Sequence, residues 1–177
     1  MRVLSRAALA AGALLAAVPA RAEEPRFLEP HVRAGVFVAT TLYLQQLIAL
    51  PMPSAAVIFH QLIVADVSGF FLPTPNGPVG FGALQAGPML RLGARGAGGA
   101  GLTVDLRALL GAGLGTQNTS SSPQTFLVPA GLGGVAVEGT NWFGRSWGLS
   151  GELVANVLIA PETDPLLVAR ISVGVAF

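Results

Sequence analysis

The last twelve residues, 166–177, alternate so regularly that they define two faces. One face is continuously apolar and carries Leu167, Ala169, Ile171, Val173, Val175 and Phe177. The other face carries Arg170, Ser172, Gly174 and Ala176. Because successive side chains of a β-strand point to opposite faces, the pattern predicts a strand with one apolar side. A membrane-spanning strand of about 9–11 residues has this pattern, and so does a half-buried edge strand of a soluble β-sandwich.

The same segment ends on an aromatic residue, Phe177. In its alternation and its last residue it resembles the closing strand of bacterial outer-membrane β-barrels, a family whose last residue is very often phenylalanine. The resemblance implies that Phe177 is the terminal assembly signal, which makes the barrel-assembly machinery a partner of the chain. It also implies a location in the bacterial outer membrane among its lipids, and we expect a monomer.

The opposite end of the chain has the features of a secretory signal peptide. Arg2 and Arg6 precede an uninterrupted apolar run, Ala7–Val18, and residues 19–22 supply the small-x-small pattern that a signal peptidase recognises. The apolar run has 12 residues. A membrane-spanning helix needs ~20. We therefore expect cleavage after Ala22 rather than a retained N-terminal anchor.

With this cleavage site, the sequence predicts three parts of the chain. Residues 1–22 are the predicted signal peptide, residues 23–30 a short periplasmic N-terminal segment, and residues 31–177 a transmembrane β-barrel domain. The 155 residues that remain (177 − 22) contain no apolar stretch of about 18 residues free of glycine, proline and polar interruptions. The sequence therefore argues against a helical membrane protein.

The composition is unusual for a soluble domain. The chain is 52% hydrophobic with a mean hydropathy of +0.64, and 11% of its residues are charged. Soluble domains carry about 25% charged residues. With Arg2, Arg6 and Arg21 removed, seven of the ten basic residues remain against nine acidic ones, a net charge of −2, which argues against a nucleic-acid partner. Cysteine is absent, so an exported chain must fold without disulfides.

Turn-forming clusters divide the chain into apolar-alternating segments. Seven segments are predicted as strands: Val32–Thr41, Ala55–Val67, Val79–Arg95, Leu102–Leu114, Thr125–Gly139, Trp147–Leu158 and Leu166–Phe177. The connectors are dense in glycine, proline, asparagine or serine and cover residues 51–54, 73–78, 96–99, 116–124, 140–146 and 161–165. These residue types supply the backbone angles and local hydrogen bonds that a chain reversal needs.

Bacterial single-chain barrels have an even number of strands, so seven segments leave one strand missing. Leu42–Leu50 is unassigned, and its pattern allows an additional strand, an extension of its neighbours or a short helix. Eight strands leave about 19 residues for each strand with its connection, which suits the smallest barrels. The predicted fold is all-β: an antiparallel up-and-down transmembrane β-barrel of eight strands after a cleaved signal peptide.

Polar side chains in the predicted strands fall on the face opposite the apolar rows. They are assigned to the lumen as a polar network: Arg33, Gln85, Arg91, Arg95, Asp105, Arg107, Glu138, Glu152, Asn156 and Arg170. Ionised groups in a narrow barrel must pair or touch water, so we expect ion pairs that fill the lumen. Arg107 is expected to pair with an acid, Glu138 or Asp105 being the candidates. An eight-stranded barrel has an interior just wide enough for side chains, although glycine and alanine on inward faces could leave cavities.

The two histidines are the residues to examine for hydrolase activity, because a hydrolase needs a base beside a nucleophile and an orienting acid. Outer-membrane lipid A deacylases carry histidine and serine two residues apart on one strand. Here His31 is followed at that spacing by Arg33, and His60 by Leu62. We therefore expect no enzyme and assign no catalytic residue.

No cofactor or metal site is expected. The acids of 161–165 lie between two prolines, and a turn explains them better than calcium binding does. Gly96–Gly101 lacks the phosphate-loop signature and is expected to form a tight hairpin turn.

Aromatic residues indicate how the barrel is oriented. Trp142, Phe143 and Trp147 cluster at one turn, as in the aromatic girdles at membrane interfaces. If Phe177 lies at the periplasmic rim, antiparallel alternation places 142–146 in the periplasm and both 116–124 and 161–165 outside the cell. The loop 116–124 would then be the longest clearly polar external connector.

Two function classes follow from this reading. The first is a small outer-membrane barrel with a structural or surface-interaction role and a filled lumen. The second is a barrel with a cavity that binds or transports a small apolar ligand, with a lipid-modifying enzyme as a weaker variant. A soluble lipocalin-like binder would need a polar exterior, which the outward leucine and valine rows oppose.

Overall fold

A computed structural model of the chain describes residues 26–41, 47–73, 79–119, 122–161 and 165–177, the side chains of 39–41, 47–48, 117–119 and 122–127 excepted. The predicted signal peptide, 1–22, lies outside the described residues. Among those residues, no helix is long and apolar enough to cross a membrane.

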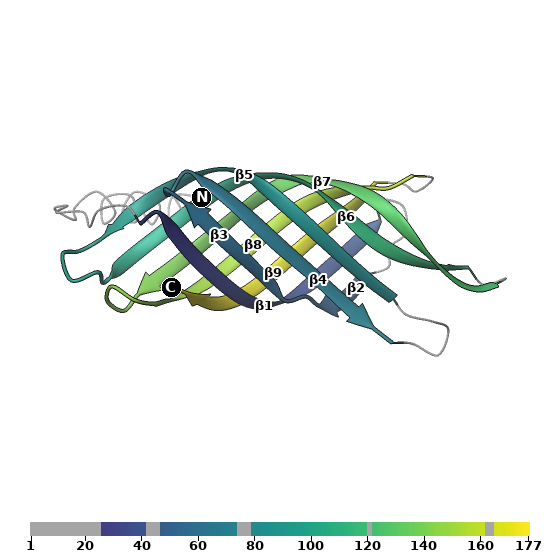
Figure 1. Ribbon diagram of the computed structural model, residues 1–177, viewed down its shortest axis with the longest axis horizontal. Coiled ribbons are helices and arrows are strands. Elements are labelled where there is room, and N and C mark those ends of the chain that lie inside the picture. The colour runs from purple at the N-terminus through teal and green to yellow at the C-terminus, as the bar shows by residue number, and fades with distance from the viewer. Residues whose placement is uncertain (1–25, 42–46, 74–78, 120–121, 162–164) are drawn as a thin grey trace, which may run out of the picture.

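The described secondary structure consists of β-strands arranged in one antiparallel sheet (Figure 1). The strands are β1 Leu28–Thr41, β2 Leu47–Pro51, β3 Ser54–Phe59, β4 Ile63–Leu72, β5 Val79–Arg95, β6 Gly101–Thr119, β7 Ser122–Trp142, β8 Gly148–Ile159 and β9 Leu166–Ala176. From β3 onward each strand pairs with the next in the chain, and β9 pairs with β1. The sheet is therefore closed into an up-and-down barrel.

The nine segments make eight strands, because β2 and β3 are two parts of one strand. Both pair with β1, and the register continues unchanged from Val36↔Pro51 to Arg33↔Ser54. Between them the Met52 N–H donates to the Gly35 carbonyl at 2.8 Å, whereas Pro53 has no N–H to donate. The eight-stranded barrel predicted from the sequence is confirmed. The prediction of a connector at 51–54 is wrong: these residues lie within a strand, and the part of Leu42–Leu50 that is described, 47–50, extends it.

The missing eighth strand is explained by a turn inside the predicted segment Ala55–Val67. This segment is a hairpin, and the Leu62 N–H donates to the Phe59 carbonyl at 3.0 Å to close its turn. His60 and Gln61 have φ of 48° and 58°. Two-residue hairpin turns with positive φ ordinarily use asparagine or glycine. The turn was missed because neither residue type is present.

The predicted polar loop 116–124 is also corrected. Strand β6 continues to Thr119 and β7 begins at Ser122, so the hairpin extends well beyond the predicted strand ends. At the N-terminus, β1 begins at Leu28 rather than at residue 31, because Leu28 already pairs with Phe59.

The strands are strongly staggered around the barrel. The stagger can be counted by following paired residues from each strand to the next, once around the barrel. A path that starts at Thr103 on β6 returns to β6 at Gly113, ten residues farther along (113 − 103). Stagger and tilt are linked in a closed sheet. Figure 1 shows the resulting inclination of the strands to the long axis.

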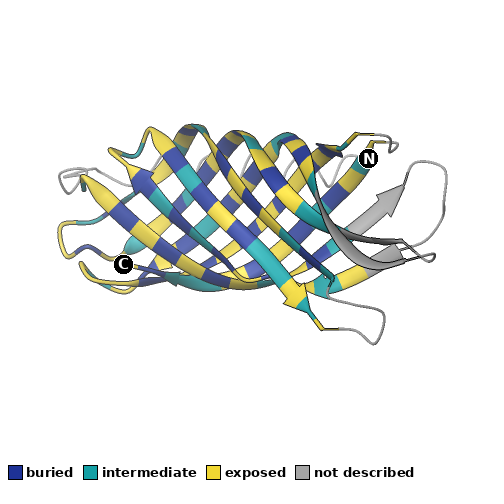
Figure 2. Ribbon diagram, turned by 45° about the vertical axis from the view of Figure 1, so that its right-hand side comes forward, coloured by how far each residue is buried: buried dark blue, intermediate teal, exposed yellow. Residues whose placement is uncertain are grey.

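Burial alternates residue by residue along the strands, as the banding in Figure 2 shows. Strand β8 alternates without interruption, with Leu149, Leu153 and Val157 exposed on its outer face. Among the described strand residues, every exposed one is apolar, glycine or proline except Asn141. The outer wall therefore suits hydrocarbon, and polar side chains are collected inside.

Two apolar clusters occupy part of the lumen. The first comprises Ala56, Ile58, Val64, Met89, Leu109, Ala136 and Val154. The second comprises Phe37, Met52, Ala83, Ala130, Leu132, Leu158 and Val168. The second cluster belongs to the part of the barrel away from the C-terminus, because Leu158 and Val168 lie near the β8–β9 connection. The rest of the lumen is polar.

Candidate functional site: the polar network of the lumen

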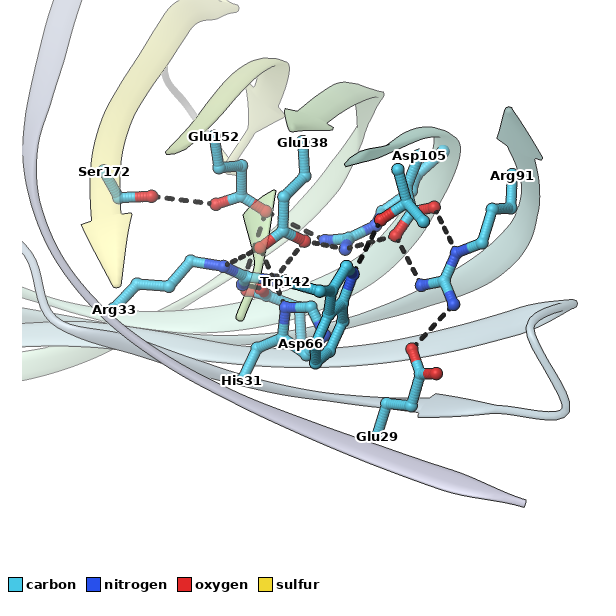
Figure 3. A network of polar contacts seen from close by, with 12 residues as sticks. Glu29, His31, Arg33, Asp66, Arg91, Asp105, Glu138, Trp142, Glu152 and Ser172 are labelled. Carbon is cyan, nitrogen blue, oxygen red and sulfur yellow. Dashed lines mark hydrogen bonds and ion pairs between the residues drawn. The ribbon is translucent and has the colours of Figure 1, made fainter. Parts of the chain in front are cut away.

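The candidate site is the group of charged side chains inside the barrel (Figure 3). The structure places all ten residues assigned to the lumen on the inner face: nine are buried, and Arg91 is half-buried. Three further charged or titratable side chains join them, namely Glu29, His31 and Asp66. We call these thirteen residues, ten and three, the lumen network.

Arg33 on β1 lies at the centre of the network. Its Nε and Nη2 donate to the two carboxylate oxygens of Glu138 at 2.9 and 2.7 Å, a bidentate arrangement. Its Nη1 donates to Asp66 at 3.0 Å and lies 3.3 Å from Glu152. One guanidinium thus connects β1 to carboxylates on β4, β7 and β8.

Arg107 on β6 contacts both acids that the sequence offered as its partners. Its Nη2 donates to Glu138 and lies 3.7 Å from Asp105. Its Nη1 donates to Glu152 at 3.0 Å. Arg107 and Arg33 therefore share two carboxylates.

Arg170 on β9 completes this central group. Its Nη1 and Nη2 each donate to Asp66 at 3.1 Å, and Nη2 also donates to Glu152 at 2.8 Å. The Ser172 hydroxyl donates to the same carboxylate at 3.1 Å. Contacts therefore connect side chains that are far apart in the sequence and lie on non-adjacent strands.

A second branch extends toward the C-terminal end of the barrel. Arg91 donates to both oxygens of Asp105 at 2.7 and 2.8 Å and to Glu29 at 2.7 Å. Arg95 donates to the other oxygen of Glu29 at 2.7 Å, and its guanidinium lies 3.2 Å from the Trp142 ring centroid. This stacking is a cation–π contact. The indole is itself fixed by a hydrogen bond to Thr103 at 3.0 Å.

His31 is fully buried beside Arg33. Its Nδ1 lies 2.8 Å from a Glu138 oxygen, and its ring meets Trp142 edge to face at 6.2 Å. No serine is among its contacts that the structure describes. His60, by contrast, lies in the β3–β4 turn, where its ring packs against Phe27 at 4.6 Å. Neither histidine stands in the geometry of a nucleophile and its base.

The lumen network is balanced in charge. Among the described residues it holds five carboxylates, Glu29, Asp66, Asp105, Glu138 and Glu152, and five guanidinium groups, Arg33, Arg91, Arg95, Arg107 and Arg170. A neutral His31 leaves no net charge. Because desolvation of each ion is costly, this matching is what permits so many charges inside a narrow barrel.

An amide pair crosses the lumen between the ions and the apolar cluster that contains Phe37. Gln85 on β5 and Asn156 on β8 donate to one another at 3.1 and 3.2 Å. The cavity beside the pair has a volume of about 10 Å³. That is room for one water at most. The barrel is filled at this level.

The chemistry of the network is that of ion pairing. The described residues contain no group of three or more histidine, cysteine, aspartate or glutamate side chains that could hold a metal ion. Each carboxylate of the network receives at least one hydrogen bond from an arginine. The arrangement therefore connects strands across the lumen.

The sequence missed three members of the network for identifiable reasons. Glu29 lies before residue 31, where the barrel was taken to begin, and it alternates with His31 and Arg33 on β1. His31 was assessed as a catalytic base and, that being set aside, as an ordinary girdle or polar strand histidine, so it was not assigned to the lumen. Asp66 lies in the segment in which a hairpin was not recognised. The alternation of Glu29, His31 and Arg33 is the signal that could have found the first two.

No protein-family model matches the chain, and no curated protein sequence matches it. Solved structures do match. Neisserial surface protein A (NspA) has a TM-score of 0.61 at 12% identity, covering 85% of this chain and 96% of that one. Ail, the attachment invasion locus protein of Yersinia pestis solved in complex with the heparin analogue sucrose octasulfate, has a TM-score of 0.50 at 14% identity, covering 86% and 100%. The N-terminal β-barrel domain of Pseudomonas aeruginosa OprF has a TM-score of 0.49 at 16% identity, covering 83% and 97%.

At these identities the likeness to NspA and Ail concerns the fold, and the closed register agrees with it. The chain has the fold of the small eight-stranded outer-membrane β-barrels.

Proposed function

We propose that the protein spans the bacterial outer membrane as a non-catalytic, monomeric barrel with a structural or surface-interaction role. The observation that carries this proposal is that, among the described strand residues, no charged side chain is exposed on the outer face, whereas matched charges lie inside the barrel. Such a wall is stable in lipid, and such a lumen offers no water-wide path.

The position of the C-terminal strand supports an orientation for the barrel in the membrane. Strand β9 ends beside the turns at 60–62, 96–100 and 143–147 (Figure 1), and we propose that this end faces the periplasm. Exposed Phe27, Phe143 and Trp147 lie at this end, as aromatic girdles do at a membrane interface. The connectors at the opposite end would then face the cell exterior.

The external connectors bear on the kind of partner. Ail was solved with a polysulfated ligand. In this chain the connectors 42–46, 73–78, 120–121 and 160–165 contain no arginine, and the chain has no lysine. A polyanion would find no cation there to pair with. We therefore propose that a surface partner is not a polyanion.

Two measurements test the proposal. Membrane fractionation with heat-modifiable gel mobility is expected to give an outer-membrane protein whose migration changes on boiling. Planar-bilayer recordings of the purified barrel are expected to show no reproducible conductance. A soluble periplasmic protein with unchanged mobility would contradict the location, and reproducible ion conductance would contradict the filled lumen.

A further inference from the structure

Among the described residues, no strand ladder joins β2 to β4 at the end of the barrel away from the C-terminus. Among the described strands, β2 pairs with β1 alone, whereas its continuation β3 pairs with both β1 and β4. The last β3–β4 pair is Ser54↔Ser68, although β4 continues to Leu72. The end of β4 and the edge of β2 therefore lie near one another without a described ladder between them.

Two prolines account for the missing ladder. The Met52 N–H points to β1, where it donates to the Gly35 carbonyl, while the Pro53 carbonyl points to β4 and accepts from the Gly69 N–H at 3.2 Å. Backbone groups alternate between the two neighbours of a strand, so residues 51 and 53 should donate toward β4. Both are proline and have no N–H to donate.

A cleft of about 500 Å³ occupies this position. Its lining combines outer-face residues with inner-face aromatic rings: Pro51, Pro53, Gly69, Phe70, Phe71, Leu72 and Phe81. Phe71 is 68% exposed on the outer wall. Phe70 and Phe81 face inward, where their ring centroids lie 6.0 and 6.3 Å from that of the buried Phe37. The cleft thus opens on the outer wall and has an aromatic floor.

We propose that this cleft binds an acyl chain of a membrane lipid. All its lining residues are apolar or glycine, so a charged headgroup or a sugar would lose its hydration without compensation. An extended peptide adding to the edge would need the donors that Pro51 and Pro53 lack. The residues that flank the cleft belong to the lipid-facing wall, so an acyl chain that is still attached to its lipid can enter the cleft from the side. The volume falls within the range of ligand pockets, ~300–1,000 Å³.

The site has no outlet through the barrel. The Gln85–Asn156 pair and the lumen network lie beyond the aromatic floor. The acyl chain is therefore held and not transported. The inference rests on the proposed membrane location and filled lumen, and it goes beyond the proposed surface-interaction role.

The test uses tryptophan reporters in barrels reconstituted into phosphatidylcholine vesicles, with acyl chains either brominated or not, because bromine quenches indole on contact. Phe70→Trp places the reporter on the cleft floor. Leu84→Trp, on the outer wall, is the positive control, and Leu132→Trp, in the closed lumen, is the negative control. The signal of Trp142 and Trp147, at the opposite end, is subtracted. Heat-modifiable mobility verifies that each variant is folded.

Brominated chains are expected to quench Phe70→Trp about as strongly as Leu84→Trp and to leave Leu132→Trp unchanged. A second variant, Pro51→Val with Pro53→Thr, restores two donors toward β4 and is expected to abolish quenching at position 70. Pro88→Val, on the outer face of β5, is the matched control and should leave the quenching intact.

Three results would overturn the inference. Quenching at position 70 no greater than at position 132 would show a closed wall. Quenching by iodide and not by brominated chains would show a water-filled opening. Quenching that appears only after a brominated free fatty acid is added would assign the cleft to a soluble ligand instead of a membrane lipid.

Discussion

At the scale of single residues, arginines in the lumen differ from the surface residue Arg145 in how far they are buried. Arg107 is buried and contacts Glu138, Glu152 and Asp105. Arg145 is exposed, with a described hydrogen bond to the Ala97 carbonyl at 3.4 Å. The two therefore provide a comparison between an arginine buried among carboxylates and an exposed arginine in a turn.

Arg107→Met is expected to lower the free energy of unfolding by about 3–5 kcal/mol, because it leaves buried carboxylates without a partner. Arg145→Met should cost about 1 kcal/mol or less. Urea unfolding of the two variants in the same detergent checks the difference. Comparable small losses from both would mean that the lumen network contributes little to stability.

At the scale of the strand, each element separates a lipid face from a lumen face. Leu153→Arg on β8 places a charge on the outer wall and is expected to cost about 2–4 kcal/mol if the position lies near the midplane. Ser150→Ala, on the inner face of the same strand, should cost much less. Equilibrium unfolding in lipid vesicles measures both, and equal effects would show that the faces are assigned wrongly.

The β3–β4 turn offers a second test at this scale. Gln61 adopts φ of 58°, a conformation that glycine occupies without steric cost. Gln61→Gly should therefore raise the free energy of unfolding by up to about 1 kcal/mol. Gln61→Ala keeps the unfavourable φ and serves as the control. A gain from alanine equal to that from glycine would place the effect in the side chain instead of the backbone.

The strands also show which features of the fold could be predicted from the sequence. Alternation alone predicted the faces of β6, β8 and β9, because period two is visible wherever one side meets lipid. It could not find the turn at His60, which lacks the usual turn residues, nor the prolines inside a strand. It could not identify Asp66 as the partner of Arg33 and Arg170 either, because pairs across the lumen depend on the stagger of the whole barrel, which no single strand encodes.

At the scale of the whole molecule, the last residue of the chain contacts the first strand, β1. The Phe177 N–H donates to the Pro30 carbonyl at 2.9 Å, and the Phe177 side chain stays half exposed. If the side chain is an assembly signal, Phe177→Ala should reduce the amount of folded barrel in cells while leaving its urea stability after refolding in detergent unchanged. Equal losses in both measurements would make Phe177 a structural residue only.

The lumen network also sets an order of events in time. Arg33 lies on the first strand, but two of its partners, Glu138 and Glu152, lie on β7 and β8 and are synthesised much later. A chain that stops before those strands leaves Arg33 with Asp66 on β4 but without the bidentate pair with Glu138 and the contact with Glu152, so burying its guanidinium would be costly. The arginine of the first strand therefore gains its full set of described acid partners only when β7 and β8 are in place, and insertion of a barrel without them is penalised.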